Sequence, residues 1–126
     1  MLMANTRKIS RTLNFLFFSA WTLLVYWLLT WPFTPGTDNG LTFIDKAVHF
    51  FLFGIFAWLM FRFIHPIKSG RYIYRPMLVL LITLLFAAFL EYKQQFIPGR
   101  YPSWLDFFSG FAGAVFALIL WTRRKN

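Results

Sequence analysis

Four long runs of apolar residues, almost free of charge, constrain this chain more than any other feature. The runs cover residues 13–31, 47–64, 77–97 and 104–121, and turn-forming Pro and Gly residues separate them. A helix of about 20 such residues crosses the hydrocarbon core of a membrane, which is roughly 30 Å thick. We therefore predict an all-α integral membrane protein, a four-helix bundle formed by a single domain over residues 1–126.

The composition agrees with a lipid environment. Only 13% of the residues are charged, against about 25% in ordinary soluble domains, and the chain carries 18 Phe and 6 Trp. It has no Cys, which excludes disulfides, thiolate zinc sites and cysteine nucleophiles. The formal net charge is +9, but the basic residues lie at the edges of the apolar runs. That placement is typical of membrane topology, so no nucleic-acid partner is predicted.

Basic residues predict which side of the membrane each end occupies. Three of the 13 Lys and Arg residues, namely Lys46, Lys93 and Arg100, lie in or beside the first and third connections. The other ten lie at the N-terminus, around the second connection and after the last run. By the positive-inside rule, both termini are expected in the cytoplasm. The first run is expected to stay in the mature protein, because no small-residue cleavage pattern follows it.

All four acidic residues fall on the predicted outer side: Asp38, Asp45, Glu91 and Asp106. The positive-inside rule explains the Lys and Arg residues of the inner side, but it does not explain the group of acidic and basic residues on the outer side. Glu91 lies within the third run, where an ionised carboxylate needs a cation or a wet cavity. We therefore predict an outward-facing polar pocket. Its candidate ligand-binding residues are Asp45, Lys46, His49, Glu91, Gln94, Gln95, Arg100 and Asp106.

Small residues follow Asp106 at helical spacing in the last run. Gly110, Gly113 and Ala117 lie four, seven and eleven positions after it, on the same face of a helix. A face of small residues allows another transmembrane helix to approach closely. These three residues are therefore predicted to form a helix-packing surface, and Asp106 is expected to point into the bundle.

The polar groups also have structural interpretations. Asp45 suits the first turn of its helix, where a carboxylate meets the positive end of the helix dipole. Ser103 and Asp106 fit a capping box at the start of the last helix. Glu91 could be neutralised by a bidentate ion pair with Arg100. These interpretations require no ligand.

Two segments carry a family resemblance. The stretch DKAVHFFLFG at residues 45–54 and the stretch EYKQQFIPGRYPSWLDFFSGFAG at residues 91–113 resemble the VanZ-like family of small bacterial membrane proteins. The resemblance implies that the family's polar positions correspond to the candidate pocket residues. It also implies a bacterial cytoplasmic membrane and an association with teicoplanin-type glycopeptide resistance, a form of antibiotic resistance.

The candidate residues leave several functions open. The first is binding of membrane lipids or a cell-wall precursor, such as a polyprenyl-phosphate or a glycolipid, with Lys46 and Arg100 holding its phosphate. His49, Glu91 and Asp106 could add acid–base catalysis, but no nucleophile stands out, so no catalytic residue is assigned and enzymatic activity stays undecided. These three side chains, together with Asp45, also offer oxygen and nitrogen ligands to a metal ion. One His is a weak signal, so no metal and no cofactor is predicted.

Two alternatives belong to other functional classes. In the first, the chain is a structural or accessory membrane protein whose polar residues form an internal ion-pair network. In the second, it is a small dimeric transporter, which requires an acid near the middle of the membrane. Glu91 lies away from the middle of its run, which argues against transport. No oligomeric state is predicted.

Overall fold

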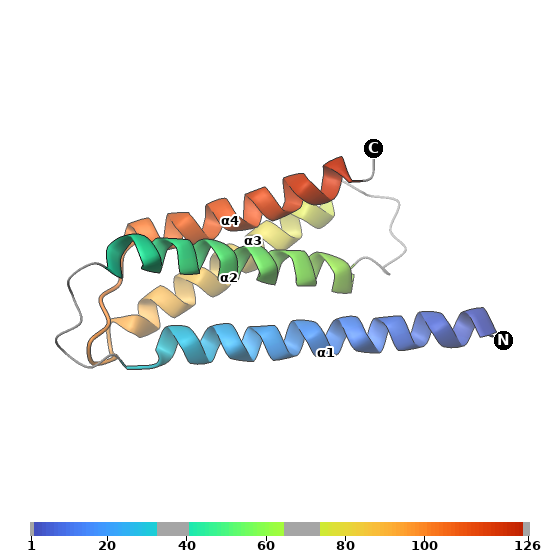
Figure 1. Ribbon diagram of the computed structural model, residues 1–126, viewed down its shortest axis with the longest axis horizontal. Helices are drawn as coiled ribbons and strands as arrows, with labels where there is room; N and C mark the ends of the chain where they lie inside the picture. Colours follow the sequence, from blue (N-terminus) through green and yellow to red (C-terminus); the bar gives the residue numbers. More distant parts are fainter. Residues whose placement is uncertain (1, 33–40, 65–73, 125–126) are drawn as a thin grey trace.

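Four long helices make up the computed structural model, which describes residues 2–32, 41–64 and 74–124. They are α1 (Leu2–Thr30), α2 (Leu41–Ile64), α3 (Tyr74–Gln94) and α4 (Trp104–Arg123) (Figure 1). Each has the length and apolar character needed to cross a membrane. The described part of the chain contains no strand. The predicted all-α class, with four helices able to span a membrane, is confirmed.

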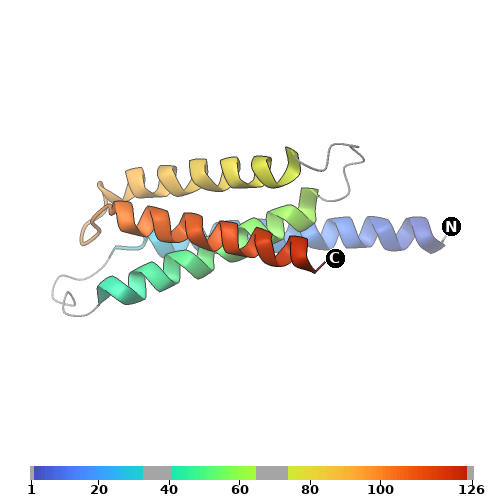
Figure 2. The same ribbon diagram turned by 90° about the horizontal axis from the view of Figure 1, so that it is seen from above.

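The two chain ends lie at one end of the bundle, and the connection between α3 and α4 lies at the other (Figures 1 and 2). The closest helix pair is α2 with α4, and α1 packs on α2 and α3. The side of the membrane on which the termini lie stays a prediction. Three of the ten basic residues that support it, Lys68, Arg71 and Lys125, lie outside the described residues, as does Asp38, one of the four acids assigned to the outer side.

Glycines of α4 allow the close approach of α2. A Cβ atom on Gly113 would lie 2.0 Å from the backbone oxygen of Phe50, which no side chain tolerates. A Cβ atom on Gly110 would lie 2.6 Å from the ring of Phe53. Ala117 is also buried on this face. The small-residue face of α4 therefore lies against α2, and Asp106, on the same face, is turned inward.

The buried core forms two clusters along the bundle. One is built around Phe56, Met60, Val79 and Leu118, and the other around Val25, Leu29, Phe53 and Leu90. Outside this core, large apolar side chains cover the surface; Leu23, Phe43 and Trp104 are 70%, 79% and 77% exposed. So much exposed apolar surface suits contact with lipid and not with water.

The first three helices begin earlier than predicted, and α3 begins at Tyr74 and not at residue 77. α1 begins at Leu2 and not at residue 13, and α2 begins at Leu41 and not at residue 47. The predicted bounds followed hydropathy, whereas polar residues with adequate helix propensity continue both helices beyond the apolar runs. The first turn of α2 therefore contains no acid, and Asp45 lies in the second turn. The prediction that Asp45 lies in the first turn is wrong.

The connection between α3 and α4 is a series of tight turns. Two backbone N–H groups bond back to the carbonyls of Lys93 and Gln94, so α3 ends at Gln94 and not at Ile97. Gly99 has a φ of 76°, a conformation that favours glycine. Arg100 then donates its N–H to the carbonyl of Ile97. These turns bring the chain to the start of α4 and place Arg100 beside α1.

Candidate functional site

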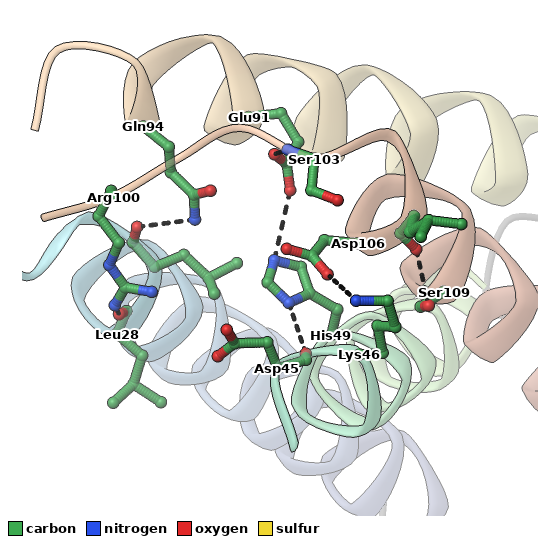
Figure 3. A network of polar contacts seen from close by, with 12 residues as sticks. Leu28, Asp45, Lys46, His49, Glu91, Gln94, Arg100, Ser103, Asp106 and Ser109 are labelled. Atoms are coloured by element: carbon green, nitrogen blue, oxygen red, sulfur yellow. Dashed lines mark hydrogen bonds and ion pairs between the residues drawn. The ribbon is translucent and has the colours of Figure 1, made fainter. Parts of the chain in front are cut away.

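His49 is the most deeply buried polar residue of α2 in the described part of the chain. Its side chain is only 3% exposed. One ring nitrogen, Nδ1, lies 2.8 Å from the backbone oxygen of Asp45, and the other, Nε2, lies 3.4 Å from Oε1 of Glu91 on α3 (Figure 3). A carbonyl oxygen can only accept a hydrogen bond, so Nδ1 carries a proton and donates it.

Glu91 uses its second carboxylate oxygen to hold the start of α4. Oε2 accepts a hydrogen bond from the backbone N–H of Ser103 at 3.0 Å. Ser103 is the N-cap residue of α4, but its side chain makes no capping hydrogen bond. The prediction of a capping box between Ser103 and Asp106 is therefore wrong. Glu91, from the neighbouring helix, accepts the N–H that Asp106 would accept in a capping box.

Asp106 lies inside the bundle and is 8% exposed. Its Oδ1 lies 3.6 Å from Nζ of Lys46 on α2. One donor atom each from His49, Glu91 and Asp106 lie within 4.8 Å of one another. The structure thus brings together residues from three helices (Figure 3). We refer to Lys46, His49, Glu91 and Asp106 as the polar cluster.

Gln94 and Arg100 lie beside the polar cluster but contact α1. The amide Nε2 of Gln94 donates to the carbonyl of Leu29 at 3.0 Å. Arg100 donates from Nη2 to the carbonyl of Leu28 at 2.6 Å and from Nε to the carbonyl of Trp31 at 2.9 Å. The carbonyls in the last turn of a helix have no partner within that helix. Gln94 and Arg100 therefore cap the C-terminal end of α1.

Other contacts replace the predicted bidentate pair between Glu91 and Arg100. The Glu91 carboxylate points to the polar cluster, and the guanidinium points to α1 (Figure 3). Burial lowers the pKa of Arg100 from its usual value, and the negative charges of Asp45, Asp106 and Glu91 raise it in part. A guanidinium still stays protonated at neutral pH. Arg100 is therefore a charged anchor for α1.

A protein-family comparison shows which family this arrangement belongs to. The model of the VanZ/LLP1 family matches residues 2–125, nearly the whole chain. The chain belongs to the VanZ/LLP1 family. The resemblance carried by residues 45–54 and 91–113 is therefore confirmed, and these two segments supply every residue of the polar cluster. Comparisons with curated proteins and with solved structures gave no match.

This VanZ/LLP1 protein has a cleft between α3 and α4, next to the polar cluster. Its volume is about 410 Å³. Glu91 lies in its wall, and most of the other lining side chains are apolar or aromatic. The cleft therefore joins the exposed apolar surface to the half-buried carboxylate of Glu91. The lining residues are Ala88, Glu91, Tyr92, Gln95, Pro102, Ser103, Trp104 and Phe107.

Two predicted site residues of this VanZ/LLP1 protein lie at the margin of the polar cluster. Asp45 is half-buried and contacts His49 through its backbone oxygen. Its carboxylate acts on Arg100 through its charge. Gln95 is exposed and lies in the wall of the cleft. Both residues are close to the site, but their side chains are not part of the polar cluster.

Sequence reasoning missed the apolar wall of the cleft and the backbone acceptors on α1. Tyr92 and Trp104, which line the cleft, are aromatic residues near the ends of apolar runs, a placement that is also typical of the membrane interface. One available signal was Ala88, a small residue three positions before Glu91 and on the same helix face. The carbonyls of Leu28 and Leu29 gave no signal, because backbone acceptors are the same at every position.

Proposed function

We propose that this VanZ/LLP1 protein binds an amphiphilic molecule of the bacterial envelope. The hydrocarbon part of the ligand occupies the cleft between α3 and α4, and its headgroup contacts the polar cluster. The observation that carries the proposal is the position of Glu91. Its carboxylate belongs to the polar cluster and also lies in the cleft wall. An apolar wall next to a few convergent polar groups is the usual composition of a small-molecule site.

The cleft suits a hydrocarbon chain. Its volume of about 410 Å³ lies within the roughly 300–1,000 Å³ of ligand sites. Tyr92 and Trp104 line it and are 63% and 77% exposed. Aromatic side chains of this kind prefer the boundary between acyl chains and headgroups. A polyprenyl or acyl chain can therefore lie in the cleft and continue into the bilayer.

The polar cluster suits a headgroup with an anion and hydroxyl groups. Lys46 supplies the cation, and an incoming phosphate competes with Asp106 for it. Sugar hydroxyls donate to the carboxylates of Glu91 and Asp106. We expect Arg100 to contribute less, because two of its nitrogens already donate to α1 carbonyls. A polyprenyl-phosphate or a glycolipid precursor has both kinds of group.

Lipid retention tests the proposal. The full-length protein is purified in a mild detergent, and the lipids that accompany it are identified by mass spectrometry. Ala88 is an exposed residue of the cleft wall, so Ala88→Phe fills the cleft without entering the core. Ala112→Phe adds the same ring at an exposed position of α4 outside the lining, and serves as the matched control.

We expect a lipid that is enriched in wild type and in Ala112→Phe and lost from Ala88→Phe. The loss should be several-fold relative to bulk phospholipid in the same sample, which corrects for differences in detergent extraction. Equal retention in all three proteins, or no enriched lipid in wild type, would count against the proposal.

A structural or accessory role is the second candidate. The contacts of Gln94 and Arg100 with α1 favour it, since they fix a helix and need no ligand. In that case the polar cluster is an ion-pair network that sets the register of the helices. Replacing Lys46 and Asp106 together by Met and Leu would then leave lipid retention unchanged, whereas headgroup binding requires Lys46.

The transporter alternative has less support. Asp45 lies in the second turn of α2, Glu91 in the last turn of α3 and Asp106 in the first turn of α4. None of these three acids lies in the middle of its helix, where a membrane-embedded coupling group would be expected. Proton-coupled uptake that is abolished by Glu91→Gln would revive transport.

We place both termini in the cytoplasm and the polar cluster at the outer face of the bacterial cytoplasmic membrane. The distribution of Lys and Arg supports this orientation. At that face the polar cluster would meet lipid-linked precursors of the cell wall, which gives a link to teicoplanin resistance a physical basis. Comparing the teicoplanin susceptibility of cells that carry wild type, Ala88→Phe or Ala112→Phe tests the link.

A further inference from the structure

Two buried polar atoms of the polar cluster have no hydrogen-bond partner: Nε2 of His49 and Oδ1 of Asp106. Their side chains are almost completely buried. Nε2 lies 3.4 Å from Oε1 of Glu91, and Oδ1 lies 3.6 Å from the ammonium of Lys46. Both distances exceed the 2.7–2.9 Å or so of a charge-assisted hydrogen bond. Polar atoms buried this deeply are costly unless another group satisfies them.

The proton on Nδ1 of His49 determines what the other ring nitrogen, Nε2, can bind. Nδ1 donates its hydrogen to the backbone oxygen of Asp45. In a neutral ring Nε2 is therefore an acceptor, and it faces a carboxylate oxygen of Glu91 that is also an acceptor. A proton or a metal ion has to lie between the two. Histidines that ligate metals commonly fix one ring N–H on a carbonyl and turn the other nitrogen to the ion.

The distances between the donor atoms suit a metal ion. Bonds of about 2.0–2.2 Å in a tetrahedral site place neighbouring ligand atoms about 3.3–3.6 Å apart. Nε2 of His49 and Oε1 of Glu91 are 3.4 Å apart. A carboxylate oxygen of Asp106 completes a set in which all atoms lie within 4.8 Å of one another. Because these atoms are up to 4.8 Å apart, the Asp106 carboxylate has to move toward the other two ligands to bind the ion.

We propose that His49, Glu91 and Asp106 bind a divalent transition-metal ion through one imidazole nitrogen and two carboxylate oxygens. This donor set suits Mn²⁺, Fe²⁺ or Zn²⁺, whereas softer ions prefer thiolates. Two carboxylates balance the 2+ charge, which reduces the cost of burying charged groups within the membrane span. Three protein ligands leave at least one position for water or another oxygen ligand. The inference goes beyond lipid binding and holds whether or not a lipid is bound.

A proton shared by His49 and Glu91 is the alternative. It would satisfy that pair but would leave Oδ1 of Asp106 with only the Lys46 ammonium at 3.6 Å. A metal ion satisfies all three side chains at once. The convergence of three helices on one point therefore favours the ion.

Metal titration tests the site. The full-length protein, purified in detergent and treated with a chelator, is titrated with Co²⁺, whose visible absorption reports its coordination. His49→Gln and Asp106→Asn each remove one ligand. Asp45→Asn removes a neighbouring carboxylate outside the proposed ligand set and keeps the backbone oxygen that holds His49, so it is the matched control.

We expect about one Co²⁺ per chain in wild type and Asp45→Asn, and at least about tenfold weaker binding in both ligand variants. Pulsed electron paramagnetic resonance of the wild type loaded with Mn²⁺ should show coupling to one imidazole nitrogen, a result that does not depend on any variant folding. The site would be overturned by wild type that binds no stoichiometric metal, by the absence of that nitrogen coupling, or by full affinity in His49→Gln.

One variant distinguishes a failure of the metal proposal from a failure of the lipid proposal. Ala88→Phe fills the cleft but keeps all three ligands, so it should bind Co²⁺ as wild type does while losing its lipid. Weakened Co²⁺ binding in Ala88→Phe would count against a metal site formed by the protein alone.

Discussion

The carboxylate of Glu91 accepts a hydrogen bond from the backbone N–H of Ser103 at 3.0 Å, so the end of α3 holds the start of α4. The same carboxylate lies 3.4 Å from His49 on α2. One side chain thus links three helices and also lies in the wall of the cleft. Two variants at this position are therefore needed: one that removes only the charge of the side chain, and one that also removes its hydrogen-bond acceptor.

Glu91→Gln and Glu91→Ala should differ in stability. Gln keeps a carbonyl oxygen for the Ser103 N–H, whereas Ala leaves that half-buried donor without a partner. We expect Glu91→Ala to lower the free energy of unfolding by about 1–3 kcal/mol and Glu91→Gln by clearly less. Unfolding in detergent, followed by circular dichroism, measures both. Equal losses in the two variants would contradict a role for this hydrogen bond.

Arg100→Ala should loosen the C-terminal end of α1, because its guanidinium donates to two carbonyls there. We expect faster amide hydrogen exchange around residues 28–31 and a free energy of unfolding that is lower by about 1–3 kcal/mol. Lys93→Ala removes a cation at the same end of the bundle and should change neither quantity.

Protonation of Arg100 should not make this contact pH-dependent. Burial lowers the pKa of Arg100, but the group stays protonated in the folded and the unfolded chain across roughly pH 6–9. Unfolding then exchanges no proton at this residue, so its contribution to stability has no slope with pH in that window. A slope that disappears in Arg100→Ala would show this to be wrong.

Gly113→Ala should be much more destabilising than Gly110→Ala. The new methyl at residue 113 meets backbone of α2 at 2.0 Å, whereas at residue 110 it meets the Phe53 ring, which can shift. We expect Gly113→Ala to lower the free energy of unfolding by about 1–3 kcal/mol or more. Gly110→Ala should lower it by less, because the higher helix propensity of Ala offsets part of the clash. Ala112→Leu, facing outward on the same helix, is the control in the same unfolding assay.

Cysteine labelling can test the orientation, because the chain has no native Cys. Gln95 and Asn5 are both exposed, at opposite ends of the bundle. With both termini in the cytoplasm, a membrane-impermeant maleimide should label Gln95→Cys in intact cells and Asn5→Cys only after the cells are opened. The reverse pattern would place the polar cluster on the cytoplasmic side. Wild type, which has no Cys, is treated in the same way and gives the background labelling.

Helix number and the inward face of α4 could be predicted because both depend on local patterns. Apolar runs of sufficient length define spans, and the spacing of Gly110 and Gly113 defines a face. Helix starts were less predictable. Hydropathy marks where a helix is apolar, but Leu2 and Leu41 begin helices whose first turns contain polar residues.

The partners of the polar residues depended on information that the sequence does not carry. Charge complementarity suggested Arg100 for Glu91, yet the turn containing Gly99 directs Arg100 to α1. A capping box suggested Asp106 for the Ser103 N–H, yet Glu91 reaches that donor from another helix. Both errors have one cause, because local motifs cannot predict which distant backbone groups need a partner.

The unbroken length of α1 has a consequence for how the protein sits in a bilayer. Its 29 residues make a rod about 43 Å long, against a hydrocarbon core of roughly 30 Å. Gln94 and Arg100 fix one end, so the surplus lies at the other, where the N-terminal part of α1 extends past the neighbouring helices (Figure 2). This part of α1 contains Arg7, Lys8 and Arg11. In a thin bilayer these cations rise above the phosphates, and in a thick one they are drawn down to them. The depth of these cations relative to the phosphates therefore depends on the thickness of the bilayer.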